Sequence, residues 1–169
     1  MAELAASHAA LVEEFLARGE PLIPWVFKVS GESFAEHVAK LRAYSRGEQV
    51  PQGFVPNTTF WLVDERRQIL GAANLRHRLT RRLLHCGGHI GYGIRPSARG
   101  NGHATWLLEQ MLRKAAGRGL RRVLLTCLAK NEASRRVIER CGGRFRNEVD
   151  TPEGPTRRYW IALPAAARR

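Results

Sequence analysis

Cysteine is scarce in this sequence, and the three that occur are far apart. Cys86, Cys127 and Cys141 are odd in number and form no CxxC pair. This spacing argues against a disulfide framework and against a structural zinc site. Because free cysteine is among the residue types most often buried, we expect three small buried or half-buried thiols and no metal site.

Long apolar runs are missing as well. No stretch approaches the roughly 20 apolar residues that a bilayer-spanning helix needs, so no membrane partner is expected. The first twenty residues lack the basic start and apolar core of a signal peptide, which predicts a cytoplasmic protein. With 169 residues, 44% of them hydrophobic, and no internal repeat or long linker, the chain suits one globular domain spanning residues 1–169.

Acidic residues are few, and their shortage is uneven. Residues 1–60 carry five Lys or Arg against seven Asp or Glu, whereas residues 61–169 carry 23 against eight. The net charge of +13 therefore resides in the second part of the chain. A basic half favours a polyanionic partner such as nucleic acid, a phosphorylated cofactor or an acidic substrate. Because most of the excess is arginine, genome base composition is an alternative cause.

Helical periodicity marks the first part of the chain. Residues 3–18 place four apolar side chains on one side of a helix: Leu4, Leu11, Phe15 and Leu16. A second helix is expected over 33–47, with Ser33 as a candidate N-cap and Gly47 as its end. Together with a Pro/Gly connector, these helices make up a helical segment, residues 1–57.

The period then changes from 3.6 to 2, which predicts strands over 58–163. Strands are expected at 58–64, 68–79, 87–96, 121–129, 144–149 and 157–163. Helices are expected between the third and fourth and between the fourth and fifth. The order predicts an α/β or α+β fold with a mixed sheet, and the strand–helix–strand unit over 89–129 predicts a parallel pair joined by a right-handed crossover.

A glycine-rich turn stands before the third helix, in the segment "IRPSARGNGHATWLLEQML", residues 94–112. The first N–H groups of a helix have no intrahelical partner, and the helix dipole favours an anion there. Gly100 and Gly102 let several N–H groups converge, and Arg99 adds a cation. A pyrophosphate suits such a site, yet neither GxxxxGK[ST] nor GxGxxG is present.

The pattern that does fit is Arg99-x-x-Gly102-x-Ala104, a few residues after a strand. This segment resembles the acyl-CoA-binding motif of the GNAT N-acetyltransferases, Arg/Gln-x-x-Gly-x-Gly/Ala. The buried strand 121–129 and the helix starting "N-x-x-S" at Asn131 follow in the family's order, so the resemblance covers residues 58–163. The chain is most similar to a bacterial branch of predicted acetyltransferases, marked by "LRH", "GGHIGY" and "RYWI".

The resemblance implies a mostly antiparallel, twisted sheet of about six to seven strands with about four helices, and acetyl-CoA as cofactor. A central parallel pair, 89–95 and 121–128, would splay around the cofactor, which Gly91 and Gly93 would permit. The implied cofactor-binding residues fall in three groups: Tyr92, Gly93 and Ile94 beside the pantetheine arm; Arg99, Gly100, Asn101, Gly102, His103 and Ala104 around the pyrophosphate; Asn131 and Ser134 on the last helix. A positive face of Arg95, Arg99, Arg113 and Arg135 would favour the phosphates.

Acyl transfer to an amine needs a base for the amine, a donor for the developing oxyanion and a proton for the leaving thiolate. In the family the amine attacks the thioester directly, and a backbone N–H near Tyr92 is the usual donor. His89, where the family often has Glu, and His77 are candidate bases. Many family members have Tyr where this chain has Ile138, so Cys141 and Tyr159 are substitute candidates for the acid; a dedicated acid is also dispensable, because a thiol pKa is about 8.5.

Three functions remain open. The first is an acetyl-CoA-dependent N-acetyltransferase of a small-molecule or peptide amine; because dimers are common in the family, the resemblance implies a homodimer. The second is an RNA- or ribosome-associated basic protein, against which stands the lack of an aromatic RNA-binding motif. The third is a CoA-binding module with little activity, suggested by Ile138. Four arginines near the 79–88 loop disfavour a polycationic acceptor and favour one with a carboxylate or phosphate: Arg76, Arg78, Arg81 and Arg82.

Overall fold

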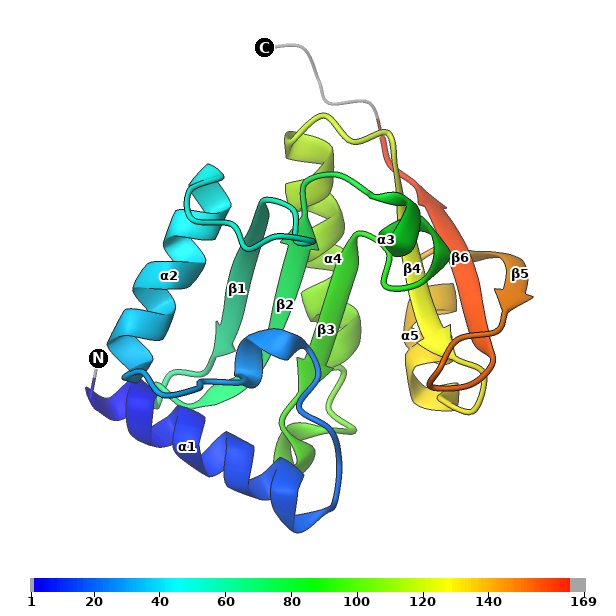
Figure 1. The fold of residues 1–169 in the computed structure, drawn as a ribbon. Coiled ribbons are helices and arrows are strands. Elements are labelled where there is room, and N and C mark those ends of the chain that lie inside the picture. The colour runs from blue at the N-terminus through cyan, green and yellow to red at the C-terminus, as the bar shows by residue number, and fades with distance from the viewer. Residues whose placement is uncertain (1, 165–169) are drawn as a thin grey trace.

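A computed structural model describes residues 2–164, and within them the chain forms five α-helices, six strands and two short 3-10 turns (Figure 1). The helices are α1 (Ala2–Ala17), α2 (Phe34–Arg46), α3 (Arg81–His85), α4 (His103–Gly117) and α5 (Glu132–Arg140). The strands are β1 (Asn57–Val63), β2 (Ile69–Arg76), β3 (Ile90–Ile94), β4 (Arg122–Leu128), β5 (Arg144–Val149) and β6 (Thr156–Ala162). The turns are η1 (Trp25–Phe27) and η2 (Pro96–Ala98). The expected α/β class and order of elements are confirmed.

The strands form two three-stranded antiparallel sheets, ordered β1-β2-β3 and β4-β6-β5. This corrects the expectation of one continuous sheet, although six strands lie within the expected number. β3 and β4 run in the same direction and come together at one end, then part toward their carboxyl ends (Figure 1). The reason is local: hydrogen bonds join the two strands at His89 and Leu124, where β3 begins, and the strands diverge below that point.

The helix ends follow the expected capping chemistry. Ser33 and Glu36 form a reciprocal capping box at the start of α2, and Gly47 ends it in the left-handed region at φ +81°. The Asn131 side chain accepts from the Ser134 N–H at the start of α5. Such caps satisfy N–H groups that have no partner within the helix.

Two hydrophobic clusters pack on opposite faces of the first sheet. Ala73 and Leu75 of β2 pack with α4, α5 and the second sheet, whereas Ile69 and Ala72 pack with α1, α2 and η1. Alternation along β2 separates Ala72 from Ala73 and Leu75, because successive side chains point to opposite faces of a strand. Ile69 joins the front cluster because the pairing with β1 is irregular between Gly71 and Ile69, which resets the alternation there. In Figure 1, α4 and α5 lie behind the strands. We call the α4 side the back face and the α1 side the front face.

Two further expectations are wrong. The 79–88 segment is not a plain loop, since Thr80 caps α3 by accepting from the Leu83 N–H. Leu16 is 63% exposed rather than inward-facing, because the buried stripe of α1 runs through His8, Leu11 and Phe15 and leaves the next position outside it. All three cysteines are free; Cys127 is buried, and the other two are half-buried, as expected. No helix in residues 2–164 is both long and apolar enough to cross a membrane.

Candidate functional site

The joint between the two sheets is made by one histidine. His89 donates its backbone N–H to Leu124 O at 2.7 Å, and its ring Nδ1 accepts from the Leu124 N–H at 2.9 Å. The side chain is 6% exposed, and burial followed by the charge of Arg76 lowers its pKa to about 4. In the neutral ring, the proton must then sit on Nε2, because Nδ1 is an acceptor. His89 thus has no free lone pair with which to act as a base.

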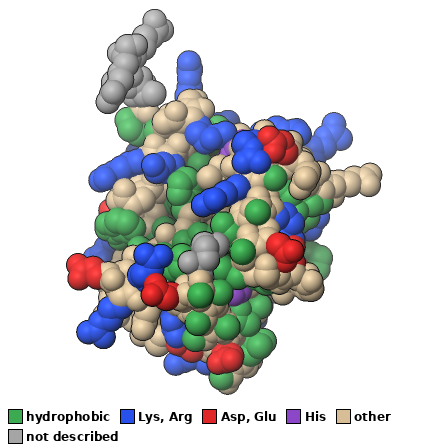
Figure 2. Space-filling model, turned by 90° about the vertical axis from the view of Figure 1, so that its left-hand side faces the viewer, with side chains coloured by type: hydrophobic (Ala, Val, Ile, Leu, Met, Phe, Trp, Pro, Cys, Tyr) green, Lys and Arg blue, Asp and Glu red, His purple; other side chains and the backbone are tan. Residues whose placement is uncertain are grey.

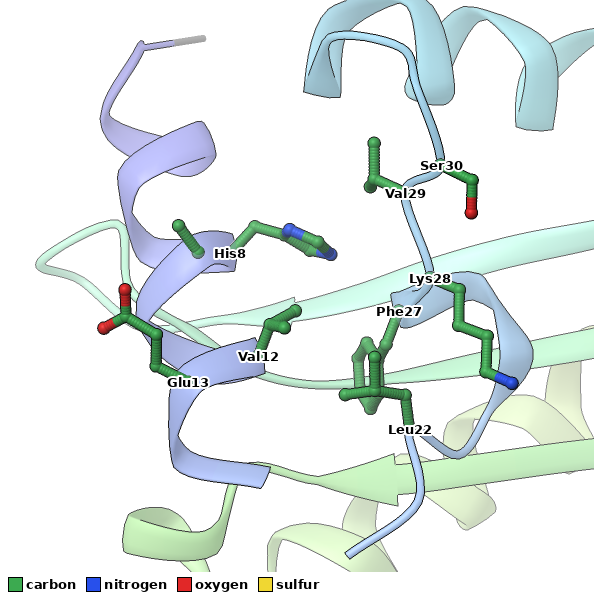
Figure 3. Close-up of a pocket in the computed structure, with 9 residues that line it drawn as sticks. His8, Val12, Glu13, Leu22, Phe27, Lys28, Val29 and Ser30 are labelled. Carbon is green, nitrogen blue, oxygen red and sulfur yellow. The ribbon is translucent and has the colours of Figure 1, made fainter. Parts of the chain in front are cut away.

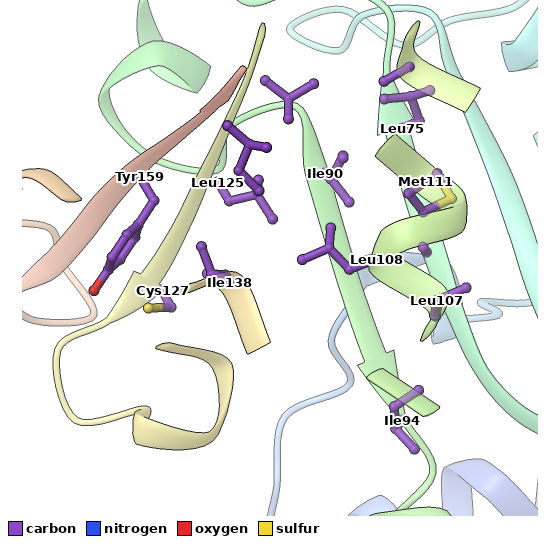
Figure 4. Packing of buried hydrophobic residues seen from close by; sticks show 14 of the residues in the cluster. Leu75, Ile90, Ile94, Leu107, Leu108, Met111, Leu125, Cys127, Ile138 and Tyr159 are labelled. Atoms are coloured by element: carbon purple, nitrogen blue, oxygen red, sulfur yellow. The ribbon is translucent and has the colours of Figure 1, made fainter. Parts of the chain in front are cut away.

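Below this joint, the backbone of β3 turns toward the gap between the strands. On the other edge of β3, the Arg95 N–H donates to Leu70 O of strand β2 at 2.8 Å. Hydrogen-bonded and free positions alternate along an antiparallel strand, so Gly91 and Gly93 face β2 with their backbone groups. Tyr92 and Ile94 direct their N–H and C=O groups toward β4. Since β4 has diverged (Figure 4), an extended ligand could pair with the groups of Tyr92 and with the Ile94 N–H as another strand would, whereas Ile94 O accepts from Arg99 Nε.

The mouth of α4 lies next to this gap. Its N-cap is Gly102 at φ +77°, with no side-chain cap, and Gly100 has φ +84°. Both conformations are in the left-handed region that favours glycine. A Cβ on either glycine would meet nothing within 4 Å, so the space in front of the turn is open. The N–H groups of the first turn of α4 therefore remain available to an anion.

Arg99, the expected phosphate-binding cation, is engaged elsewhere. Its two terminal nitrogens donate to both carboxylate oxygens of Glu20 at 2.9 and 2.6 Å, and its Nε donates to Ile94 O at 3.2 Å. The guanidinium also lies 5.4 Å from the centre of the Phe15 ring. The side chain joins the glycine turn to the chain that follows α1, and Glu20 neutralises its charge.

The rest of the expected positive face is also largely neutralised. Arg95 Nε lies 2.6 Å from a Glu14 oxygen, and Arg135 pairs with Glu132 and Glu139 at 2.7 Å each. Arg113 alone of the four has no ion pair within the described residues. The N–H groups of the turn are therefore what it offers most directly to an anion, and phosphate contacts from these arginines stay a prediction.

On the back face, Tyr92 bridges the gap. Its hydroxyl lies 3.0 Å from Ser134 Oγ, so the ring reaches from β3 to α5. Burial, countered in part by this hydrogen bond, raises the pKa of the Tyr92 hydroxyl, and nearby Cys127 and Cys141 add to the shift. The structure thus brings together Tyr92 and Ser134, which were expected to lie near a cofactor, with Asn131 one turn away as the N-cap of α5.

Of the candidate acids, Tyr159 lies in the same back-face core (Figure 4), and Cys141 packs against it. Tyr159 is 1% exposed, and burial raises the pKa of its hydroxyl. Cys141 lies with Sγ 3.8 Å from Thr105 O, and burial raises its pKa to about 11. The thiol of CoA, with a pKa of about 8.5, is a stronger acid than the Cys141 thiol, so Cys141 is a poor proton source for the CoA thiolate. Ile138, with no exposed surface, fills the core beside them.

His77 lies at the other end of the molecule from the glycine turn. Arg118, the C-cap of α4, donates to its Nδ1 at 2.9 Å, and its Nε2 lies 2.9 Å from Thr58 Oγ1. With Nδ1 accepting, the neutral ring carries its proton on Nε2 and donates to Thr58. Because α4 has 15 residues, its two ends are about 22 Å apart. The structure does not bring His77 to the glycine turn.

A cavity of about 440 Å³ opens on the front face, beside the end of β2. It is bounded by η1, the segment before β1, strand β2, helix α3 with the residues after it, and the β5–β6 loop. Arg76, Arg82 and Asn74 contribute polar groups to its wall, and Glu153 lies on the β5–β6 side. Sequence reasoning had named the two arginines. It had missed Asn74, whose signal is a polar residue two positions before Arg76 in an otherwise apolar strand.

A second hollow, of about 460 Å³, lies between α1 and the segment before α2 (Figure 3). His8 and Val12 of α1 face Phe27 and Val29 across it. Burial, then the nearby His37, lower the pKa of His8. This hollow belongs to the front-face cluster and contains none of the expected site residues.

On the face of the molecule seen in Figure 2, the basic side chains do not gather into one patch. Lysine and arginine side chains are scattered over this face (Figure 2), with carboxylates and apolar groups between them. Several arginines of the basic half are paired, as Arg157 is with Glu132 and Glu148 at 3.2 and 3.4 Å. A nucleic-acid surface usually has its cations clustered along one stripe, so this arrangement does not favour one.

Comparison with known proteins agrees with the geometry. A family model described as an acetyltransferase (GNAT) domain matches residues 3–144. No curated protein sequence is significantly similar. Among solved structures, the ribosomal L7/L12 alpha-N-protein acetyltransferase RimL, in complex with coenzyme A, aligns with a TM-score of 0.69 and 17% identity, over 96% of this chain and 89% of that one.

Two other solved structures are similar over comparable lengths. MccE, a microcin C7 self-immunity acetyltransferase in complex with acetyl-CoA and AMP, has a TM-score of 0.66 and 13% identity, over 94% of this chain and 87% of that one. A phosphinothricin acetyltransferase from Sinorhizobium meliloti, in complex with acetyl-CoA, has a TM-score of 0.65 and 15% identity, over 98% and 88%. At these identities the likeness shows a shared fold.

Proposed function

Because this chain belongs to the GNAT acetyltransferase family, we propose that it transfers an acetyl group from acetyl-CoA to a primary amine. One observation carries the proposal: β3 and β4 part beside the uncapped, glycine-lined mouth of α4. This arrangement offers one site for a pyrophosphate and, continuing from it, a slot for an extended chain. Together they match the pyrophosphate of CoA and the pantetheine arm that extends from it.

The expected cofactor residues receive separate roles. Backbone N–H groups from Gly100 to Ala104, including those of Asn101, Gly102 and His103, would bind the pyrophosphate, whereas the Arg99 N–H already donates to Pro96 O at 3.4 Å. The backbone at Tyr92, Gly93 and Ile94 would lie along the pantetheine arm. Asn131 and Ser134 would face it from α5. We propose that the Arg99 side chain positions the turn through Glu20 and that phosphate contacts come from the backbone.

Acetyl-CoA, when bound, supplies an acetyl group activated as a thioester. In the proposed reaction, a neutral amine forms the new C–N bond, the C–S bond breaks, and the CoA thiol is released. An ammonium acceptor thus loses two protons, of which the sulfur takes one and the solvent the other. The N–H groups of Tyr92 and Ile94 point toward the gap, where one of them could donate to the carbonyl oxygen as negative charge develops.

Proton transfer has a simpler assignment than the sequence suggested. His89 and His77 both have Nδ1 occupied as an acceptor, and their pKa values are lowered. Cys141 and Tyr159 have raised pKa values. We therefore propose that the open front cavity lets solvent take the amine proton and that the thiolate, with a thiol pKa of about 8.5, needs no dedicated acid.

A matched pair of glycines tests this function. Gly102 and Gly119 both have a left-handed φ, at +77° and +82°, with nothing within 4 Å of an added Cβ, but they lie at opposite ends of α4. Leucine at either position should cost about 1–2 kcal/mol of backbone strain. Only Gly102→Leu should abolish the rise in Tm that millimolar acetyl-CoA produces and the acetylation of an amine library.

The results separate the three functions. If the unmodified protein gains no thermal stability with acetyl-CoA, or if Gly102→Leu and Gly119→Leu respond alike, the proposal is wrong. Binding without turnover of any amine would favour a CoA-binding module. RNA binding that weakens steeply between about 50 and 200 mM salt, by 10³-fold or more, would favour the nucleic-acid alternative.

A further inference from the structure

The front cavity contains polar groups whose bonding is incomplete, and they indicate what kind of amine enters it. We infer that the acceptor is a small amino-acid-like molecule, whose carboxylate or phosphinate is bound by Arg76 and Arg82 while Asn74 Oδ1 accepts an N–H of its amine. The inference rests on the proposed acetyl transfer and adds the class of acceptor.

Arg76 supplies the first argument. Its Nη1 donates to Gly87 O at 2.7 Å and to Gly88 O at 3.0 Å, which fixes the guanidinium in the cavity wall. Burial lowers the pKa of Arg76, and Arg82 lowers it further, as expected for two cations close together. Within residues 2–164, neither arginine has a carboxylate at ion-pair distance. Most other partly buried arginines here do have one, as Arg95 has Glu14.

A half-buried guanidinium without a counter-ion is costly unless a ligand completes it. Its planar, forked donors match a carboxylate or a phosphinate at two points. Arg82, exposed on the short helix α3, also lines the cavity and can approach the same anion from the rim. The only acid among the lining residues is Glu153, which is exposed on the β5–β6 loop. The charge of this cavity is therefore unsuited to a polyamine.

Asn74 supplies the second and independent argument. It has no exposed surface, its Nδ2 donates to Asn57 Oδ1 at 2.6 Å and to Thr59 Oγ1 at 3.1 Å, and its Oδ1 has no partner. A buried carbonyl oxygen without a donor costs free energy and calls for an explanation. Asn74 lines the same cavity as Arg76. Its oxygen is closed to solvent in this structure, so an incoming amine supplies the missing donor once the side chain turns toward the cavity.

The two groups stand next to the proposed acetyl donor. Asn74 and Arg76 project from the same face of β2, about 7 Å apart along the strand. Asn74 pairs with Gly91 of β3, and Arg76 Nη2 would lie 3.8 Å from a Cβ on that glycine. The next residue, Tyr92, borders the gap. When the arginines bind the carboxylate or phosphinate of the acceptor, its amine is thus presented to the front of the slot. Trp25, Phe54 and Leu83 form an apolar wall for the acceptor's side chain.

A panel of acceptors tests the chemistry. Product formation from acetyl-CoA is measured by mass spectrometry for several amino acids and phosphinothricin, for the α-amide and the decarboxylated amine of each, and for spermidine. We expect kcat/KM to be at least tenfold higher for the best anionic acceptor than for its amide. If neutral amines or spermidine are acetylated better, the inference is wrong while the proposed function stands.

Two neighbouring arginines provide a matched variant and control. Arg82→Gln should raise the KM for the anionic acceptor about tenfold and leave the KM for acetyl-CoA unchanged. Arg81→Gln, exposed on the same helix but outside the cavity lining, should change neither. Arg76→Lys keeps the charge but loses the forked geometry of the guanidinium. It should reduce the ratio of kcat/KM between an acidic acceptor and its α-amide. Equal behaviour of the Arg82 and Arg81 variants toward the anionic acceptor would overturn the inference.

Binding decides the case if no amine is turned over. The protein saturated with CoA is titrated calorimetrically with the same amino acids and amides. Binding of acids but not amides, weakened by Arg82→Gln, supports the inference without any turnover. Failure of every anionic amine to bind overturns it, and failure of acetyl-CoA itself to bind overturns the proposed function beneath it.

Discussion

His89 shows how one side chain can substitute for a strand-to-strand hydrogen bond. The peptide groups of β3 and β4 pair only at their start, and the imidazole Nδ1 supplies the acceptor that the Leu124 N–H would otherwise lack. A buried N–H without a partner costs about 1–3 kcal/mol, so the ring contributes to the joint of the two sheets. A position that the family resemblance suggested for a base is occupied here by a structural acceptor.

We predict that His89→Asn keeps activity and that His89→Leu loses stability. Asparagine can place Oδ1 close to the position of Nδ1, so kcat/KM should fall by less than about tenfold, against about 100-fold or more for the loss of a general base. Leucine leaves the Leu124 N–H unpaired and should lower the free energy of unfolding by about 1–3 kcal/mol. Steady-state kinetics and urea unfolding measure the two effects; equal, large losses of kcat in both folded variants would restore His89 as a base.

The same histidine should make stability depend on pH. Its folded pKa of about 4 lies below the ordinary 6.5, so the unfolded chain takes up the proton first as the pH falls. The part of the free energy of unfolding that depends on a neutral His89 is fully present above pH 6.5. It is lost as the pH falls from there to about 4, and the loss amounts to about 3 kcal/mol. The difference in free energy of unfolding between the unmodified protein and His89→Asn, measured as a function of pH, should show this loss between pH 6.5 and about 4.

At the scale of elements, α1 supports the glycine turn from outside the sheet. Glu14 accepts from Arg95 Nε at 2.6 Å and from the N–H and hydroxyl of Ser97, both at 3.0 Å. Burial pushes the pKa of Glu14 up, but the hydrogen bonds from Ser97 and Arg95 outweigh it and lower the pKa overall. The helix thus fixes the start of the segment whose N–H groups are proposed to bind pyrophosphate.

We predict that Glu14→Ala weakens acetyl-CoA binding without changing the chemical step. The turn would lose three hydrogen bonds and part of its fixed shape, and the KM for acetyl-CoA should rise about threefold to tenfold, equivalent to about 0.7–1.4 kcal/mol. Glu13→Ala, exposed on the same helix and without these contacts, is the control. A change in kcat with an unchanged KM would contradict a positioning role for Glu14.

The sequence revealed features that depend on neighbouring residues and missed contacts between distant ones. Periodicity located both helices, and local chemistry located the caps Ser33 and Asn131, since a cap depends on neighbours three residues away. The contact between Glu14 and Ser97 joins residues 83 positions apart, and no local pattern encodes it. For the same reason the sequence did not reveal that Arg99 pairs with the distant Glu20. It also predicted one continuous sheet, whereas His89 joins two separate sheets.

At the scale of the whole molecule, the two sheets share one joint and one core. The back-face cluster includes residues of α4, α5 and both sheets, so the halves are held behind the gap while their strands part in front of it. A cofactor in that gap would contact β3 on one side and α5 on the other. Binding should therefore stabilise the assembly of the two sheets as well as order the glycine turn.

We predict a localised pattern of protection when acetyl-CoA binds. At a concentration 100 times its Kd, a ligand adds about 2.7 kcal/mol to the free energy of unfolding, which for a chain of this size corresponds to a rise in Tm of about 5–10 °C. At labelling times too short for global unfolding, hydrogen exchange should slow at Tyr92, Ile94 and 99–104. The amides of α2, which pack only on the front face, should exchange as before. Protection that includes α2 but omits 99–104 would place the ligand elsewhere, because the proposed pyrophosphate site is the uncapped first turn of α4.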